Sequence, residues 1–136
     1  MTTEVGLYLV NGQAGNVGTP GAPILHFSLL VNAVTGDVTG HAEQTQAVAP
    51  PGNKITIGNI TGHVRYTGLG KYTKLVSLEG SAIIPFPPPA IGSYVMPFTA
   101  SFAIDNAWDG RGGWTLGNTT VDNVPLTADE RLAKAA

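Results

Sequence analysis

The chain contains one five-residue pattern four times, and this repeat limits the possible folds more than any other feature. The four copies are Val38–Ala42, Ile60–Val64, Leu78–Ala82 and Phe98–Phe102. Each copy reads apolar, polar, glycine or alanine, polar, apolar. Its first, third and fifth side chains therefore share one face of an extended strand. Successive copies begin 22, 18 and 20 residues apart, about one strand plus one turn. We therefore expect neighbouring antiparallel strands that carry equivalent positions side by side.

Length and composition fit a single all-β domain over residues 1–136. The 136 residues include 18 glycines and 10 prolines, and the apolar stretches are short and bounded by turn residues, as strands require. We predict an antiparallel meander of six to eight strands that forms a barrel or a barrel-like sandwich. A short C-terminal helix is predicted to follow, because Thr127 and Glu130 have the spacing of a capping box.

The repeat also predicts how two strands pair. A turn at residues 50–53 would set Gly40 near Gly62 and His41 near His63. The apolar phase shifts at Gly58-Asn59, which indicates a β-bulge. A glycine inside a strand costs about 0.5–1 kcal/mol relative to alanine, so a row of glycines needs a steric reason. Strong sheet curvature is our preferred reason, and a large side chain that fills the space is the alternative.

Charge and composition exclude several classes of function. The net charge is −2, and 12% of the residues are charged. The chain therefore lacks the positive electrostatic potential that attracts nucleic acid or anionic lipid. There is no cysteine, so thiolate chemistry is excluded. The first ten residues lack the basic region of a secretory signal, and no apolar run reaches membrane-spanning length. We expect a cytoplasmic protein without membrane partners, and export without a classical signal stays an open alternative.

The polar face of the repeated strands supplies the first candidate site, formed by His41, His63, Arg65 and Glu79. Two imidazoles and a carboxylate that converge could hold Zn²⁺ or act as an acid–base pair. The alternatives are a polar ligand-binding surface and a plain solvated sheet face, on which threonine and serine are common.

The stretch Trp108–Trp114 supplies the second candidate site. Two indoles flank Asp109, Arg111 and three glycines. In sugar-binding loops, aromatic faces stack on the ring while charged groups bond to its hydroxyls. The alternative is that each tryptophan anchors the loop to the core.

These observations favour a non-enzymatic binding or interaction module whose ligand is a carbohydrate or a protein. The alternative is a small barrel enzyme that uses the His/His/Glu cluster for acid–base or metal chemistry. No cofactor is expected, because phosphate-binding loops, dinucleotide fingerprints, G-x-S-x-G and H-E-x-x-H motifs are all absent. The sequence predicts neither the ligand nor the oligomeric state.

Three segments carry a resemblance: Leu25–Asn32, Thr35–Gly40 and Thr45–Pro51. In these segments the chain resembles a family of small bacterial proteins of unknown function. The resemblance implies a bacterial origin and a single domain. Because it rests on strand and turn patterns, it assigns no functional residue.

Overall fold

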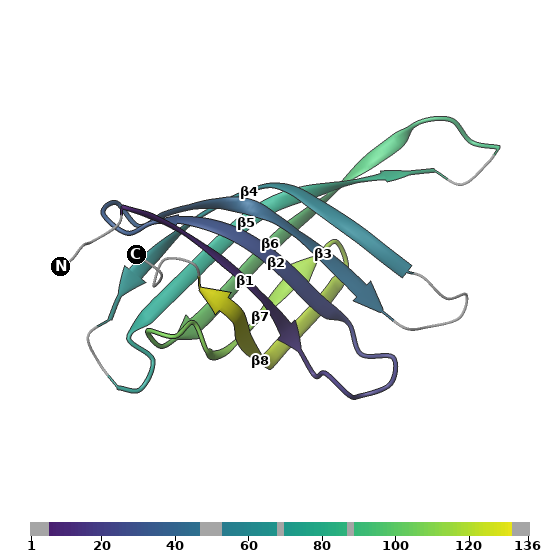
Figure 1. The fold of residues 1–136 in the computed structure, drawn as a ribbon. Helices are drawn as coiled ribbons and strands as arrows, with labels where there is room; N and C mark the ends of the chain where they lie inside the picture. Colours follow the sequence, from purple (N-terminus) through teal and green to yellow (C-terminus); the bar gives the residue numbers. More distant parts are fainter. Residues whose placement is uncertain (1–5, 47–52, 68–69, 87–88, 132–136) are drawn as a thin grey trace.

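The computed structural model describes residues 6–46, 53–67, 70–86 and 89–131, which form eight β-strands (Figure 1). The strands are β1 (Leu7–Gly15), β2 (Ile24–Asn32), β3 (Asp37–Gln46), β4 (Asn53–Tyr66), β5 (Lys74–Pro85), β6 (Ser93–Ile104), β7 (Gly110–Leu116) and β8 (Thr119–Arg131). The described residues form no helix that is long and apolar enough to cross a membrane.

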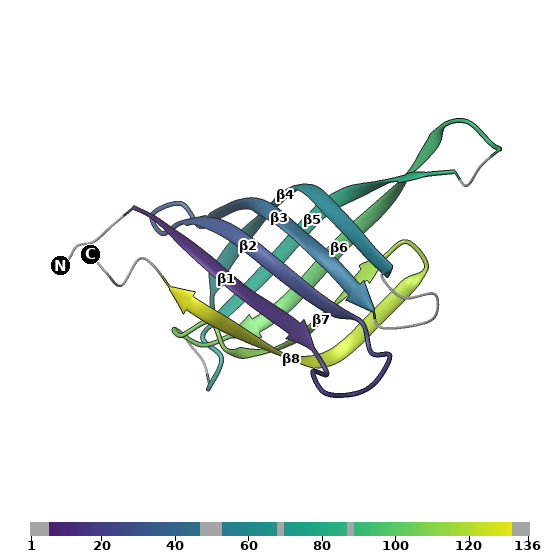
Figure 2. The ribbon, with the colours of Figure 1, turned by 45° about the vertical axis from the view of Figure 1, so that its right-hand side comes forward.

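The strands form a closed antiparallel barrel in meander order (Figures 1 and 2). Each strand pairs with the next one in the chain, and β8 pairs with β1 to close the barrel. The predicted all-β antiparallel meander is therefore confirmed, and it forms a barrel rather than a sandwich. Closure leaves no strand without two neighbours, which solves the problem of exposed sheet edges over most of the molecule.

The predicted C-terminal helix is wrong over the described residues. Residues 127–131 continue β8, where Ala128 lies opposite Gly12 and Glu130 opposite Asn11. A helix of one or two turns is marginal alone, whereas strand pairing satisfies the open edge of β1. Residues 132–136 lie outside the described part of the chain, as does most of the predicted turn at 50–53.

Alternate side chains of every strand point into a packed core that contains both tryptophans. Trp108 and Trp114 are 1% and 2% exposed. The Trp114 indole N–H donates to Gln44 Oε1 at 2.7 Å, and the Trp108 indole N–H donates to the Tyr8 hydroxyl at 3.1 Å. These bonds satisfy the indole donors inside the barrel, as buried tryptophans require. Side chains thus fill the interior, and ligand binding is to be sought on the outer face.

In the barrel, the second residues of neighbouring repeats lie opposite each other, whereas the sequence predicted this arrangement for the third residues. Thr61 lies opposite Thr39 on one side and Glu79 on the other, and Glu79 lies opposite Thr99. Each inward glycine therefore faces a large apolar residue of the next strand. The pairs are Gly40 with Ile60, Gly62 with Leu78 and Gly80 with Phe98. The predicted pairing of Gly40 with Gly62 is wrong by two residues.

Close approach of neighbouring strands explains these glycines. A Cβ atom on Gly62 would lie 2.0 Å from the Ser77 carbonyl oxygen and 2.7 Å from Leu78 Cδ2. The main chain of β5 and the Leu78 side chain thus occupy the space together, which gives a steric reason for glycine at this position. The predicted bulge at Gly58-Asn59 is confirmed, because the register shifts there and Asn59 has a φ of 51°.

Candidate functional site

The structure does not bring His41 and His63 together. Asp37, four residues from His41 along β3, lies opposite His63. At the rise of an extended strand, four residues offset the main chains of the two histidines by about 13 Å along the strand direction. His63 Nδ1 lies 3.5 Å from Asp37 Oδ1, and Glu79 lies diagonally across from His63 on β5. The predicted convergence of the three residues is therefore wrong, and the described residues hold no group of three or more His, Cys, Asp or Glu side chains placed to bind a metal.

A different histidine, His26, is the neighbour of His41. His26 lies opposite Glu43 on β3, and both histidines line a depression of 230 Å³ on the outer face. Two of its groups already have partners. Glu43 Oε2 lies 3.4 Å from Lys54 Nζ, and His26 Nε2 lies 3.4 Å from Thr45 Oγ1. These groups form an exposed polar patch. Arg65 is exposed near the end of β4, away from this patch.

The Trp108–Trp114 stretch anchors the barrel instead of presenting aromatic faces to a sugar. Both indoles are buried. Asp109 also has a structural contact, because its Oδ1 accepts a bond from the main-chain N–H of Ala128 at 3.3 Å. The anchoring alternative is thus confirmed for both tryptophans, and a stacking role for their rings is ruled out.

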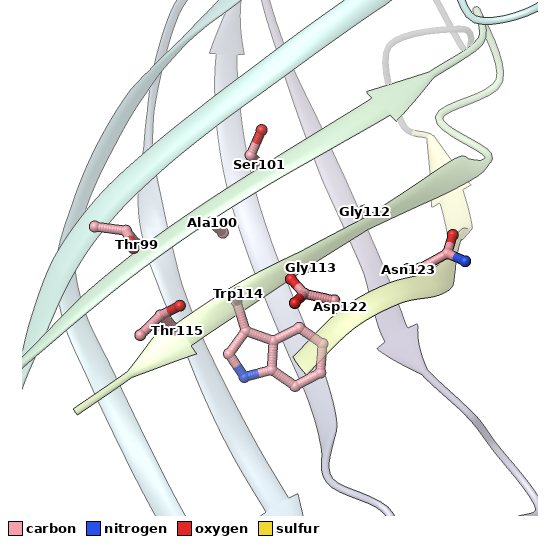
Figure 3. Close-up of a pocket in the computed structure, with 9 residues that line it drawn as sticks. All are labelled: Thr99, Ala100, Ser101, Gly112, Gly113, Trp114, Thr115, Asp122 and Asn123. Atoms are coloured by element: carbon pink, nitrogen blue, oxygen red, sulfur yellow. The ribbon is translucent and has the colours of Figure 1, made fainter. Parts of the chain in front are cut away.

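A groove on the outer face of β6, β7 and β8 is a candidate site among the described residues (Figure 3). Its volume is 420 Å³. The lining residues are Thr99, Ala100, Ser101, Gly112, Gly113, Trp114, Thr115, Asp122 and Asn123. Ser101 lies opposite Gly113. Because Gly113 has no side chain, the sheet surface is hollow between β6 and β8.

A β-bulge in β8 forms the far wall of the groove. Gly112 lies opposite Val124 and Trp114 opposite Val121, so two residues of β8, Asp122 and Asn123, face the single residue Gly113. Asn123 takes up the extra length with a φ of 54°. A Cβ atom on Gly113 would lie 2.1 Å from the Val121 carbonyl oxygen. The bulge therefore requires glycine at this position.

Arg111 holds this bulge in place. Its Nε donates to Asn123 Oδ1 at 3.0 Å, and its Nη2 donates to the Asn123 carbonyl oxygen at 2.7 Å. The planar guanidinium thus fixes both the side chain and the main chain of one residue. Arg111, which the sequence suggested as a ligand contact, is placed to position the groove wall.

The groove presents hydroxyl and carboxylate groups around a main-chain floor. Thr99 lies opposite Thr115, and the Thr115 and Thr120 hydroxyls lie 3.3 Å apart. Asp122 provides one carboxylate, and no lysine, arginine or histidine lines the groove. The site therefore offers many neutral donors and acceptors with a single negative charge, which suits a ligand rich in hydroxyls.

Sequence reasoning found part of this site. Gly112, Gly113 and Trp114 belong to the Trp108–Trp114 stretch, and Thr99 and Ser101 are the polar positions of the fourth repeat, but Asp122 and Asn123 were not singled out. The available signal was an Asp-Asn pair inside a strand, close in sequence to Gly112-Gly113.

The fold and the groove define a class: a closed eight-stranded antiparallel barrel with a filled interior and a polar groove on its outer face. The chain belongs to the family described as Domain of unknown function (DUF1842), whose model matches residues 5–120. This confirms the resemblance to a family of unknown function. The match includes the β6 and β7 sides of the groove and ends before Asp122. No curated protein matches the chain.

Proposed function

We infer that this protein is a non-enzymatic binding module that holds a neutral carbohydrate in the groove of β6, β7 and β8. The observation that carries this proposal is the pairing of Ser101 with Gly113 opposite the Asp122-Asn123 bulge. It creates a hollow lined by groups that can bond to sugar hydroxyls.

The chemistry of the lining supports a sugar over other ligands. Hydroxyl side chains both donate and accept, as sugar hydroxyls do, and a carboxylate accepts bonds from two adjacent hydroxyls. Asp122 is the only charged residue that lines the groove, and no lysine or arginine lines it to pair with a phosphate. A large apolar ligand would leave the hydroxyls of Thr99 and Ser101 without partners. Because no aromatic ring is exposed in the groove, affinity would come from hydrogen bonds alone and would be modest.

The experiment compares two serine variants against a panel of neutral saccharides. Ser101 lines the groove, while Ser77 lies directly opposite it on β5 and does not line the groove. One neutral hydrogen bond contributes about 0.5–1.5 kcal/mol, so Ser101→Ala should raise Kd by about 2- to 13-fold. Asp122→Asn should raise it by about tenfold or more, because bonds to a charged acceptor are stronger. Ser77→Ala should bind as the unmodified protein does.

Calorimetry or an array of immobilised glycans followed by titration would measure these affinities. A saccharide whose Kd responds equally to Ser101→Ala and Ser77→Ala would place binding elsewhere. If no neutral saccharide bound at millimolar concentration, the carbohydrate proposal would be wrong.

The rival enzyme hypothesis lacks a comparable observation. Its three residues do not converge, and the neighbouring pair His26 and His41 lies on an exposed sheet face. Acid–base chemistry needs groups within hydrogen-bond reach of one reacting atom. The binding module is therefore the function that the geometry supports best.

A further inference from the structure

The hairpin formed by β5 and β6 extends beyond the barrel wall as an arm (Figures 1 and 2). The pairing of β4 with β5 ends at Ser81, and that of β7 with β6 ends at Phe98. Pro97 pairs with Ser81, which is also paired with Gly58 of β4, and the Pro97 carbonyl oxygen accepts a bond from the Gly117 N–H. Within the described part of the chain, residues 82–85 and 93–96 therefore form strand pairs only with each other. We define these residues, with the described residues of the connection between them, as the arm.

The arm exposes large apolar side chains on both of its faces. Ile83 and Val95 lie opposite each other on one face. On the other face, the rings of Phe86 and Tyr94 pack with their centroids 5.5 Å apart. The exposed fractions are 70% for Ile83, 41% for Phe86, 96% for Ile91, 43% for Tyr94 and 66% for Val95.

The arm also carries no charge. Residues 80–104 contain no Asp, Glu, Lys, Arg or His. Free sheet edges in soluble proteins are usually protected by charged side chains, prolines or bulges. Pro85 ends β5 in the arm and Pro97 interrupts β6 next to it, but residues 93–96 of β6 include neither a proline nor a charge. This four-residue edge is therefore open to pairing with another strand.

The exposed apolar area is distributed over both faces and the connection of the arm. At about 200 Å² for a fully exposed large side chain, these five side chains expose roughly 600 Å² in total, and edge pairing covers the part of it around Val95. A standard interface covers about 800 Å² on each partner. The main chain and prolines of the arm supply further surface of the same uncharged kind.

We propose that the arm binds the arm of a second copy of this chain, with the 93–96 edges of β6 paired antiparallel across a two-fold axis. Two identical strands that pair antiparallel are related by such an axis, so one edge complements itself. Absence of charge means that bringing two arms together brings no like charges together. The pairing extends the two hairpins into one four-stranded sheet and covers the side chains around Val95.

A lipid surface suits the arm less well than a second copy does. The open edges would leave main-chain N–H and C=O groups without partners in hydrocarbon. The arm also lacks the lysines and arginines that bind anionic head groups. Pairing with the arm of a second copy gives these main-chain N–H and C=O groups hydrogen-bond partners.

The experiment measures the mass of the full chain by sedimentation across a concentration series. The test variant is Val95→Lys, which places two lysines near the two-fold axis. The matched control is Val34→Lys, because Val34 is an 83% exposed valine next to β2 and outside the arm. We expect a dimer for the unmodified chain and for Val34→Lys, and a dissociation constant raised by about tenfold or more for Val95→Lys.

A second measurement needs no variant. In a mixture of isotope-labelled and unlabelled chains, filtered NMR experiments should detect contacts between residues 93–96 of different copies. A chain that stays monomeric at several hundred micromolar, or a dimer that Val95→Lys leaves unchanged, would overturn the proposal. Binding of the monomer to phosphatidylcholine vesicles through the arm would also overturn it and would identify lipid as the partner.

Discussion

Replacing Gly62 with alanine tests how the barrel wall is built. The new Cβ would lie 2.0 Å from the Ser77 carbonyl oxygen, and main chain cannot rotate away as a side chain can. Strands β4 and β5 would have to separate at this point. Overpacking of this kind costs about 1–3 kcal/mol, and we place Gly62→Ala near 3 because the contact is with main chain. The lost flexibility of the unfolded chain offsets about 1 kcal/mol, which leaves a net loss of about 2 kcal/mol.

Thermal unfolding followed by circular dichroism measures this loss. At about 2.1 cal/mol/K per residue, the 136-residue chain has an unfolding entropy of about 0.29 kcal/mol/K, so 2 kcal/mol lowers Tm by about 7 °C. The matched control is Gly58→Ala in the same strand, where a Cβ would meet nothing within 4 Å. Its Tm should stay level or rise slightly. Equal Tm values for the two variants would refute the steric explanation of the inward glycines.

Two further predictions concern the core and the β4 bulge. Gln44→Leu leaves the buried Trp114 indole N–H without its partner, so Tm should fall by about 4–10 °C, which corresponds to about 1–3 kcal/mol. The double variant with Trp114→Phe should lose less than the sum of the two single losses, and strict additivity would show that the bond has no effect. Asn59 has a φ of 51°, so Asn59→Gly should keep its stability while Asn59→Val loses about 1–2 kcal/mol in urea titration. Equal losses for both Asn59 variants would contradict the positive φ.

Local patterns predicted the strands and the β4 bulge because both depend on neighbouring residues. Alternation in Ile24–Asn32 and in the Phe98–Ile104 part of β6 marks one buried face, and Gly58-Asn59 interrupts the alternation where the register shifts. The second half of β1 gives no such alternation, because its inward residues Gly12 and Ala14 are small.

Long-range pairing explains what local patterns missed. The sequence near Thr127 fits a helix start, but the open edge of β1 makes it a strand. The register of β3 on β4 depends on contacts between strands that are distant in sequence. Aligning the glycines of the two repeats therefore wrongly predicted that His41 lies next to His63. The groove likewise depends on Asp122 and Asn123 bulging opposite Gly113, a pairing between strands that neither segment specifies alone.

Amide NMR of the ¹⁵N-labelled chain, titrated with the saccharide of the panel that binds most tightly, shows whether the ligand binds outside the filled barrel. We expect the largest shift changes on residues 99–101, 112–115 and 121–123, while the indole N–H signals of Trp108 and Trp114 keep their positions. Large changes at both indole signals, with the β6–β8 groove unaffected, would contradict this expectation.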